Sequence, residues 1–308
     1  MNKTYLGIDT SNYKTSIAIV DDNNQILFEK SELLSVKQGE RGLRQSDAFF
    51  KHANTLPDFI NEVFNHVDPS TIGGIAYSSR PRRVEGSYMP VFLAGENLAK
   101  TLSSTLKATI KDYSHQEGHI EAVLSTSEVP DIDKFIMFHL SGGTTEFLLC
   151  ERDDNGFKTD IIGGTKDISI GQLLDRLGVR AGLSFPSGAY LDEIAISNTV
   201  SNKCKKIKFD NGYFNLSGIE TDLLNRLDEG ESLEEIVPGL FEELSSLLQQ
   251  SADFLSKEYD VRNVFLAGGV ASSSYIRARV SGVEWGDARL SGDNAVGIAR
   301  LGRRYFNK

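Results

Sequence analysis

The chain contains the same three-strand pattern twice, and this repeat limits its fold more than any other feature. In the first copy, the apolar runs YLGID and TSIAIVD flank a polar turn, and DDNN leads into a third run, QILFEK. The second copy, DKFIMFHLSGGTTEFLLCERDDNGFKTDIIGGT, begins roughly 130 residues later and repeats the order of strands and turns. Each copy is predicted to form a β-meander, and the pair indicates an internal duplication.

Segments with helical apolar spacing follow each meander. After the first, SDAFFKHANTLPDFINEVFNHV predicts a helix with Ser46 or Asp47 as its N-cap, and His52 and His66 on its surface. IGGIAYSS predicts a buried strand, PVFLAGENLAKTLSSTL a helix, and ATIKDYSH a short strand that leads into a helix over 115–124. After the second meander, helices are expected over 169–182, 188–200, 217–229 and 231–259, and a last helix ends the chain.

Composition excludes several classes of protein. The net charge of −10 argues against a broad basic surface for nucleic acid, so a polyanion would need a local basic patch or a helper subunit. Cys150 and Cys204 match no zinc or redox spacing, and no signal peptide is evident. No apolar run approaches the length of a membrane span. We therefore expect a cytoplasmic protein that does not bind membranes.

Three turns of small residues follow apolar strands: Asp9-Thr10-Ser11, Ser141-Gly142-Gly143-Thr144-Thr145 and Gly268-Gly269-Val270-Ala271-Ser272-Ser273. Glycine lets the backbone approach a ligand closely, and free N–H and hydroxyl groups can bind phosphate or carboxylate oxygens. A single turn of this kind is weak evidence. Two within matching meanders and a third before a helix predict a nucleotide site.

The stretch HQEGH places His115 and His119 four residues apart. On a helix they share one face, which suits a metal site, an acid/base pair or two solvent-facing residues. In zinc proteases the glutamate directly follows the first histidine. Here Glu117 stands one position later, so it gives a protease no support.

Several motifs occur in the order and rough spacing of one family: LGIDTSNYKTSIAIVD, HQEGHIEA, HLSGGTTEFLL, IGQLLDRLGVRAGLSFPSGAYLDEIA, LSGIET, FLAGGVASSS and GDNAVGIA. Over nearly its whole length the chain resembles the TsaD family of the actin-like ATPase superfamily. The resemblance implies an α/β fold of two duplicated actin-like (ASKHA, ribonuclease H-like) domains with a ligand cleft between them. On this basis domain I would comprise 1–125 with the C-terminal helix 294–308, and domain II would comprise 126–293.

The resemblance also implies an activity. TsaD-like proteins transfer threonylcarbamoyl from threonylcarbamoyl-AMP to N6 of the tRNA adenosine adjacent to the anticodon, generally together with TsaB-like and TsaE-like partners. They bind one metal ion, iron or zinc, at positions that correspond here to His115, His119 and Asp293. Two histidines on one helix face and a distant carboxylate form a three-ligand site that leaves positions open for substrate.

The family's substrate contacts correspond to three groups of residues. The strand end and turn that would supply backbone donors to the adenylate consist of His139, Leu140, Ser141, Gly142 and Gly143. Asp175 and Asp192 would hold the ribose, and Gly188 would allow its close approach. Ser273 stands where the family commonly has an asparagine.

The chain departs from the family pattern in five places. Tyr13 and Lys14 replace an acidic pair, Thr144 replaces a histidine, and Gln172 replaces an acidic residue. In place of a glycine-rich loop and an apolar stretch, the segments 78–92 and 38–57 carry a candidate acceptor-side basic patch: Arg41, Arg44, Arg80, Arg82 and Arg83. Arginine forks bind phosphate or carboxylate, but they can equally form surface ion pairs with acids. The departures leave two alternatives open: transfer of a carbamoyl or acyl group to another acceptor, and a nucleotide-binding regulatory subunit.

Overall fold

The computed structural model describes residues 3–11, 13–35, 43–129, 131–198, 203–291 and 295–308. They form two compact units. Unit 1 comprises 1–131, 152–158 and 293–308, and unit 2 comprises 132–151 and 159–292. Within the described residues, no helix has both the length and the apolarity needed to cross a membrane.

Unit 1 contains a five-stranded sheet in the order β3-β2-β1-β4-β5. The first three strands are antiparallel neighbours, and β4 and β5 continue the sheet in parallel with β1. The strands are β1 (Thr4–Thr10), β2 (Lys14–Asp21), β3 (Ile26–Leu33), β4 (Ile72–Arg80) and β5 (Thr109–Ser114). The predicted first meander is therefore confirmed.

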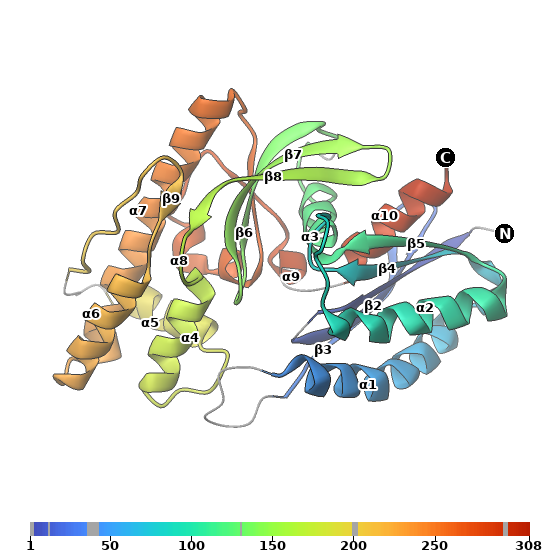
Figure 1. Ribbon diagram of the computed structural model, residues 1–308, viewed down its shortest axis with the longest axis horizontal. Coiled ribbons are helices and arrows are strands. Elements are labelled where there is room, and N and C mark those ends of the chain that lie inside the picture. Colours follow the sequence, from blue (N-terminus) through green and yellow to red (C-terminus); the bar gives the residue numbers. More distant parts are fainter. Residues whose placement is uncertain (1–2, 12, 36–42, 130, 199–202, 292–294) are drawn as a thin grey trace. The chain divides into compact units, whose positions relative to one another are not determined.

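Four helices cover this sheet (Figure 1): α1 (Gln45–His66), α2 (Leu93–Leu106), α3 (His115–Leu124) and α10 (Val296–Phe306). Helices α1 and α2 lie on one face, and α3 and α10 lie on the other. The short 3₁₀ helices η1 (Pro69–Thr71) and η2 (Pro90–Phe92) precede β4 and α2. The N-cap of α1 is Arg44 and makes no side-chain cap, so the expectation that Ser46 or Asp47 caps this helix is wrong.

Unit 2 repeats the arrangement with the sheet order β11-β10-β6-β7-β8-β9. Strands β6 and β7 are antiparallel, and β10 and β11 extend the sheet in parallel with β6. The strands are β6 (Lys134–Leu140), β7 (Thr145–Asp153), β8 (Gly156–Thr165), β9 (Tyr213–Phe214), β10 (Val264–Ala267) and β11 (Glu284–Trp285). The order β8-β7-β6-β10-β11 matches β3-β2-β1-β4-β5, as an internal duplication predicts.

The helices of unit 2 pack around a large apolar core that includes Phe138, Leu173 and Phe241. They are α4 (Ile170–Arg180), α5 (Gly188–Ser197), α6 (Ser217–Asp228), α7 (Leu233–Tyr259), η3 (Gly269–Ser272), α8 (Ser274–Arg277) and α9 (Ala288–Ser291). The four helices expected after the second meander are confirmed within a few residues at their ends. The tip of the β7–β8 hairpin, 152–158, belongs to unit 1 rather than to unit 2.

Candidate functional site

The histidine pair of unit 1 lies on the first two turns of α3. Ser114 is the N-cap and forms a capping box with Glu117, so the helix begins at His115. The imidazole Nε2 atoms of His115 and His119 face each other at 3.0 Å. Asp293, the third expected ligand, lies outside the described residues, and among the described ones no group of three or more metal-binding side chains occurs.

The spacing of the two imidazoles fits a shared ion. Histidine nitrogens bind zinc at about 2.0–2.1 Å, so two of them at the tetrahedral angle of a zinc site are about 3.3 Å apart, which agrees with the observed separation to within a few tenths of an ångström. The observed separation of the Nε2 atoms is 3.0 Å. His119 is buried, and the His115 side chain is 16% exposed.

The other ring nitrogen of His115 contacts the carboxylate of Asp9, a residue that the sequence assigned only to a turn of small residues. Asp9, near the end of β1, is fully buried, and both of its oxygens lie 3.0 Å from His115 Nδ1. The ring of Phe92 contacts the same imidazole, with 6.2 Å between ring centroids. Unit 1 therefore brings Asp9, His115 and His119 together from segments about 100 residues apart.

Glu117 has a structural role. Its carboxylate accepts hydrogen bonds from the Ser114 backbone N–H and hydroxyl, both at 2.8 Å, and from Phe157 N at 3.2 Å. Arg83 Nη1 lies 3.7 Å away. Burial raises the pKa of Glu117, and this effect outweighs that of the hydrogen bonds, which lower the pKa. The glutamate thus joins α3 to the tip of the β7–β8 hairpin.

His52 is not on the surface, and that expectation is wrong. Its side chain is fully buried between α1 and the first strands. The Nε2 atom lies 2.6 Å from the Ser11 carbonyl oxygen, and Nδ1 lies 2.7 Å from Thr15 Oγ1. A carbonyl only accepts, so Nε2 carries the proton and the Thr15 hydroxyl donates to Nδ1. Burial lowers the pKa of His52, which favours this neutral form. His66 is exposed, as expected.

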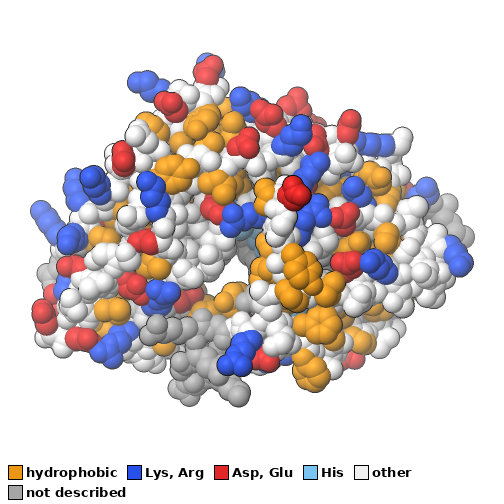
Figure 2. Space-filling model, viewed as in Figure 1, with side chains coloured by type: hydrophobic (Ala, Val, Ile, Leu, Met, Phe, Trp, Pro, Cys, Tyr) orange, Lys and Arg blue, Asp and Glu red, His pale blue; other side chains and the backbone are white. Residues whose placement is uncertain are grey.

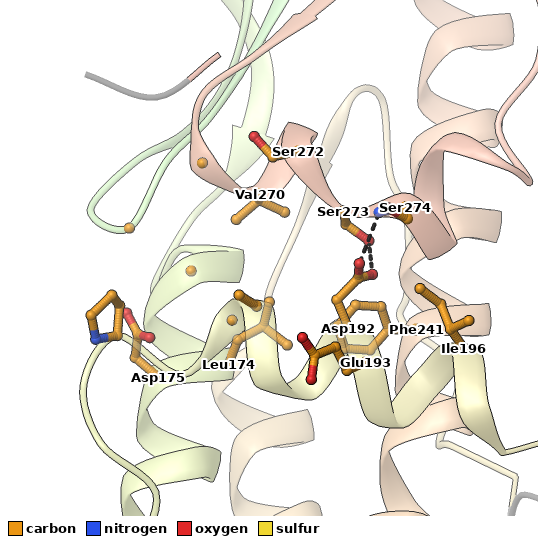
Figure 3. A pocket seen from close by; sticks show the side chains of 16 residues that line it. Leu174, Asp175, Asp192, Glu193, Ile196, Phe241, Val270, Ser272, Ser273 and Ser274 are labelled. Atoms are coloured by element: carbon orange, nitrogen blue, oxygen red, sulfur yellow. Dashed lines mark hydrogen bonds between the residues drawn. The ribbon is translucent and has the colours of Figure 1, made fainter. Parts of the chain in front are cut away.

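Unit 2 contains a pocket of about 480 Å³ (Figure 3). Five of the nine expected nucleotide-binding residues line it: Gly142, Asp175, Gly188, Asp192 and Ser273. Leu174, Val270 and Phe241 supply apolar walls. The lining comes from segments of unit 2 that are up to about 130 residues apart in the sequence.

The other four expected residues do not line this pocket. His139 and Leu140 are buried in β6. Ser141 and Gly143 lie in the turn between β6 and β7, where Thr144 N donates to Ser141 Oγ at 3.1 Å. The turn packs against α4, since Ser169 Oγ donates to the Gly142 carbonyl at 2.8 Å. Gln172 completes the capping box of α4 with Ser169. The glutamine therefore still caps the start of this helix, although the family has an acidic residue here.

The carboxylates of the pocket differ in the number of hydrogen bonds that they accept from the protein. Asp192 accepts from Ser273 Oγ and from Ser274 N at 2.9 Å (dashed lines in Figure 3). It also accepts from Tyr275 N at 3.1 Å, so it binds the first backbone N–H groups of α8 beside the N-cap residue Ser273. Asp175 accepts from Ser187 N at 2.7 Å, and burial raises its pKa.

Glu193 also lines the pocket and was not predicted. It has no hydrogen-bond or ion-pair partner in the described parts of the chain. The described lining contains no lysine, arginine or histidine. Carboxylates accept hydrogen bonds, so this lining suits neutral donor groups such as ribose hydroxyls.

Two of the described arginines of the expected patch are paired with carboxylates. Arg41 lies outside the described residues, and Arg44 is exposed. Arg80 is paired with Asp112, and Arg83 with Asp153 at 3.0 Å. Arg82 is half-buried, and its backbone N–H donates to Ser87 Oγ at 3.1 Å. On the face shown in Figure 2, positive and negative side chains are interspersed.

Solved structures with similar folds share little sequence with this chain. HypF from T. kodakarensis matches with a TM-score of 0.65 at 14% identity, over 100% of this chain and 49% of that one. Component A of the (R)-2-hydroxyglutaryl-CoA dehydratase of Acidaminococcus fermentans matches with a TM-score of 0.58 at 15% identity, over 99% and 100%. A ROK family glucokinase from Streptomyces griseus gives 0.51 at 13% identity, over 98% and 99%. These are actin-like folds, which confirms the expected fold class.

Relatives found by sequence identify the family more narrowly than the similar folds do. A protein of Thermotoga neapolitana named tRNA N6-adenosine threonylcarbamoyltransferase is 28% identical, over 96% of this chain and 92% of its own length. A probable bifunctional tRNA threonylcarbamoyladenosine biosynthesis protein of Methanocaldococcus jannaschii is 30% identical, over 96% of this chain and 54% of its own. The family model TsaD, described as tRNA N6-adenosine threonylcarbamoyltransferase, matches residues 31–300. The chain therefore belongs to the TsaD family of transferases.

Proposed function

We propose that this protein transfers threonylcarbamoyl from threonylcarbamoyl-AMP to N6 of the tRNA adenosine adjacent to the anticodon. The observation that carries the proposal is the family match over residues 31–300, together with a pocket that gathers five of the family's substrate positions. In the proposed reaction the N6 amine attacks the carbamoyl carbon, the bond from that carbon to the phosphate oxygen breaks, AMP leaves, and N6 loses a proton.

The pocket of unit 2 is assigned to the adenylate. Its apolar walls suit a base, and its carboxylates suit the ribose hydroxyls. Asp175 has one oxygen held by Ser187 N, so its second oxygen remains available to a hydroxyl. Asp192 already accepts three hydrogen bonds, and we assign it mainly to holding the Ser273–Tyr275 turn in place. Holding the substrate in one orientation would supply much of the rate enhancement.

The histidine pair of unit 1 is assigned to one divalent ion, iron or zinc, with Asp293 as the third ligand. When bound, such an ion polarises the carbonyl that is attacked. The chain itself would supply two neutral imidazoles with facing Nε2 atoms, and burial would exclude most water from them.

A different acceptor is the second candidate. The segment 78–92 carries Arg80 and Arg83 in place of a glycine-rich loop, and both arginines bind carboxylates of their own unit. A regulatory role is the third candidate, suggested by the changes at Tyr13, Lys14 and Thr144. One experiment distinguishes both candidates from the proposed reaction.

The test incubates the protein with threonylcarbamoyl-AMP and unmodified tRNA, with TsaB-like and TsaE-like proteins present, and measures the modified nucleoside by mass spectrometry. We expect modification by the natural chain and at least a ~100-fold loss in His119→Ala, the size of effect typical for losing electrostatic stabilisation of a transition state. His66→Ala is the matched control, since this exposed histidine contacts the Glu62 carbonyl of its own helix and the ring of Phe28, and neither belongs to the candidate site. AMP release without tRNA modification would favour another acceptor. The absence of both AMP and modified tRNA would favour the regulatory role.

A further inference from the structure

The side chain of Asp9 contacts the His115 imidazole, and a role of its turn in binding phosphate does not explain this contact. Both carboxylate oxygens lie 3.0 Å from Nδ1, and the carboxylate is fully buried. A carboxylate accepts hydrogen bonds and cannot donate one, so the proton of this contact belongs to Nδ1. The lone pair of His115 is then on Nε2, the atom that faces His119.

We propose that Asp9 is a positioning residue that sets the tautomer and the orientation of His115, so that Nε2 is presented as a ligand. This inference rests on the ion-binding role in the proposed function. A histidine that binds a metal commonly donates its other ring N–H to a carboxylate, which orients the ring and raises its basicity. The geometry around His115 has this form.

The position of Asp9 is itself held from several sides. Its backbone pairs with Ser16 in the ladder between β1 and β2, and β1 is the central strand of the five. The turn that follows is held by the buried His52, whose Nε2 donates to the Ser11 carbonyl at 2.6 Å. Thr15, in the next strand, donates to the other ring nitrogen of His52 at 2.7 Å. A carboxylate on so fixed a backbone can hold an imidazole in one orientation.

The His115 ring is also enclosed on its apolar side. Phe92 lies at 6.2 Å between ring centroids, with the ring planes tilted by 49°. The backbone at the start of α3 is held by the capping box and by the hydrogen bond from Gln116 N to the Pro81 carbonyl at 3.0 Å. With the helix start and Phe92 fixed, removal of Asp9 would free the ring to flip or to change its tautomer without moving the helix.

Two variants test the proposal in the full-length chain. Asp9→Ala removes the acceptor, and Asp9→Asn keeps the shape and one acceptor oxygen but removes the charge. We measure the affinity for zinc ions alone by competition with a chromophoric chelator. Removal of such an outer partner typically weakens metal binding ~10–100-fold. We expect a loss of that size for Asp9→Ala and a smaller one for Asp9→Asn.

The matched control is Glu121→Gln. This change also removes a buried carboxylate from unit 1, on α3 itself, but Glu121 is paired with Arg304 and not with a histidine. We expect its zinc affinity to stay within about threefold of the natural chain, the size of change that follows from ~0.6 kcal/mol. Melting curves of all variants separate unfolding from loss of binding. If both Asp9 variants bind zinc as tightly as the natural chain, while His115→Ala does not, the proposal is overturned.

A second measurement does not depend on metal, adenylate or tRNA. The nitrogen resonances of His115 in the metal-free chain report its tautomer, and we expect Nδ1–H with a bare Nε2. A proton on Nε2 in the natural chain would overturn the proposal. An absence of tRNA modification would count against the proposed reaction alone, and leaves this result standing.

Discussion

Asp175 combines a cost in stability with an assigned role in binding. Burial raises its pKa in the folded chain, so the folded state binds a proton more tightly than the unfolded one. The stability that follows is fully present below the unfolded value of about 4 and is lost as the pH rises through the folded value. At neutral pH, the ionised carboxylate therefore destabilises unit 2.

Asp175→Asn is expected to change stability and binding in opposite directions. The melting temperature at pH 7 should rise relative to the natural chain, and the difference should shrink near pH 3.5, where the natural carboxyl is protonated. Affinity for AMP should fall about 10-fold or more, because a hydrogen bond to a charged group contributes ~1.5–3 kcal/mol. Differential scanning fluorimetry and AMP titration give the two values. The exposed Glu258→Gln on α7 is the control, and a variant that loses both stability and affinity would contradict this account.

Single residues also show where sequence patterns stop being informative. The motifs singled out Asp175, Asp192 and Ser273 as substrate contacts, and all three residues line one pocket. They gave no signal for Glu193, which follows Asp192 on α5 as an ordinary helix acid would. They missed the contact of Asp9 with His115, since it depends on how β1 and α3 pack. His52 was placed on the surface because a histidine in a polar helical stretch carries no sign of its buried partners.

At the scale of elements, the crossing of α3 and α10 depends on two glycines. A Cβ on Gly297 would lie 1.9 Å from the Gly118 carbonyl oxygen and 3.0 Å from Ala122 N. A Cβ on Gly118 would lie 2.9 Å from Ile298 Cδ1. Backbone atoms cannot move aside as a flexible side chain can, so α10 lies against the helix that carries the histidines only while Gly297 has no side chain.

Gly297→Ala is therefore expected to destabilise unit 1 by about 3 kcal/mol. The better helix propensity of alanine returns at most ~1 kcal/mol. The transition of unit 1 should fall by about 6–12 °C in a thermal scan. Gly218→Ala on α6 is the control, because a Cβ there meets no atom within 4 Å. A shift no larger than that of the control would mean that α10 can move away from α3 at little cost.

Elements were predictable where the signal is local. Apolar alternation and turn residues marked both meanders, and helical spacing marked α4 to α7. The parallel neighbours were not predictable in this way, because β10 pairs with β6 across more than a hundred residues. The capping of α1 was mispredicted, because Ser46 and Asp47 are good cap residues but the chain enters the helix earlier, at Arg44. Nor does any local pattern indicate that the hairpin tip 152–158 belongs with unit 1.

At the scale of the whole molecule, the charge constrains how an RNA could bind. The chain carries a net charge of −10, and Arg80 and Arg83 are already neutralised by Asp112 and Asp153. Of the arginines expected to meet the acceptor, Arg44 is exposed and Arg82 is half-buried. In the proposed function, a tRNA contact through the expected patch would draw on Arg44 and Arg82 among the described arginines, and Arg41 lies outside the described residues.

This limits the salt dependence of tRNA binding, which can be measured with the partner proteins present. Each arginine that neutralises a phosphate contributes about 0.9 to the slope of log affinity against log salt concentration. Replacing both Arg44 and Arg82 by alanine is expected to reduce the slope by about two and to weaken binding at low salt. The matched control is the double variant Lys257→Ala and Arg262→Ala, which removes two exposed positive charges from unit 2. An unchanged slope in the arginine variant would show that the rebuilt segments 38–57 and 78–92 do not contact the tRNA backbone through these two residues. The acceptor-side role of Arg44 and Arg82 would then have to be abandoned, whether or not the chain modifies tRNA.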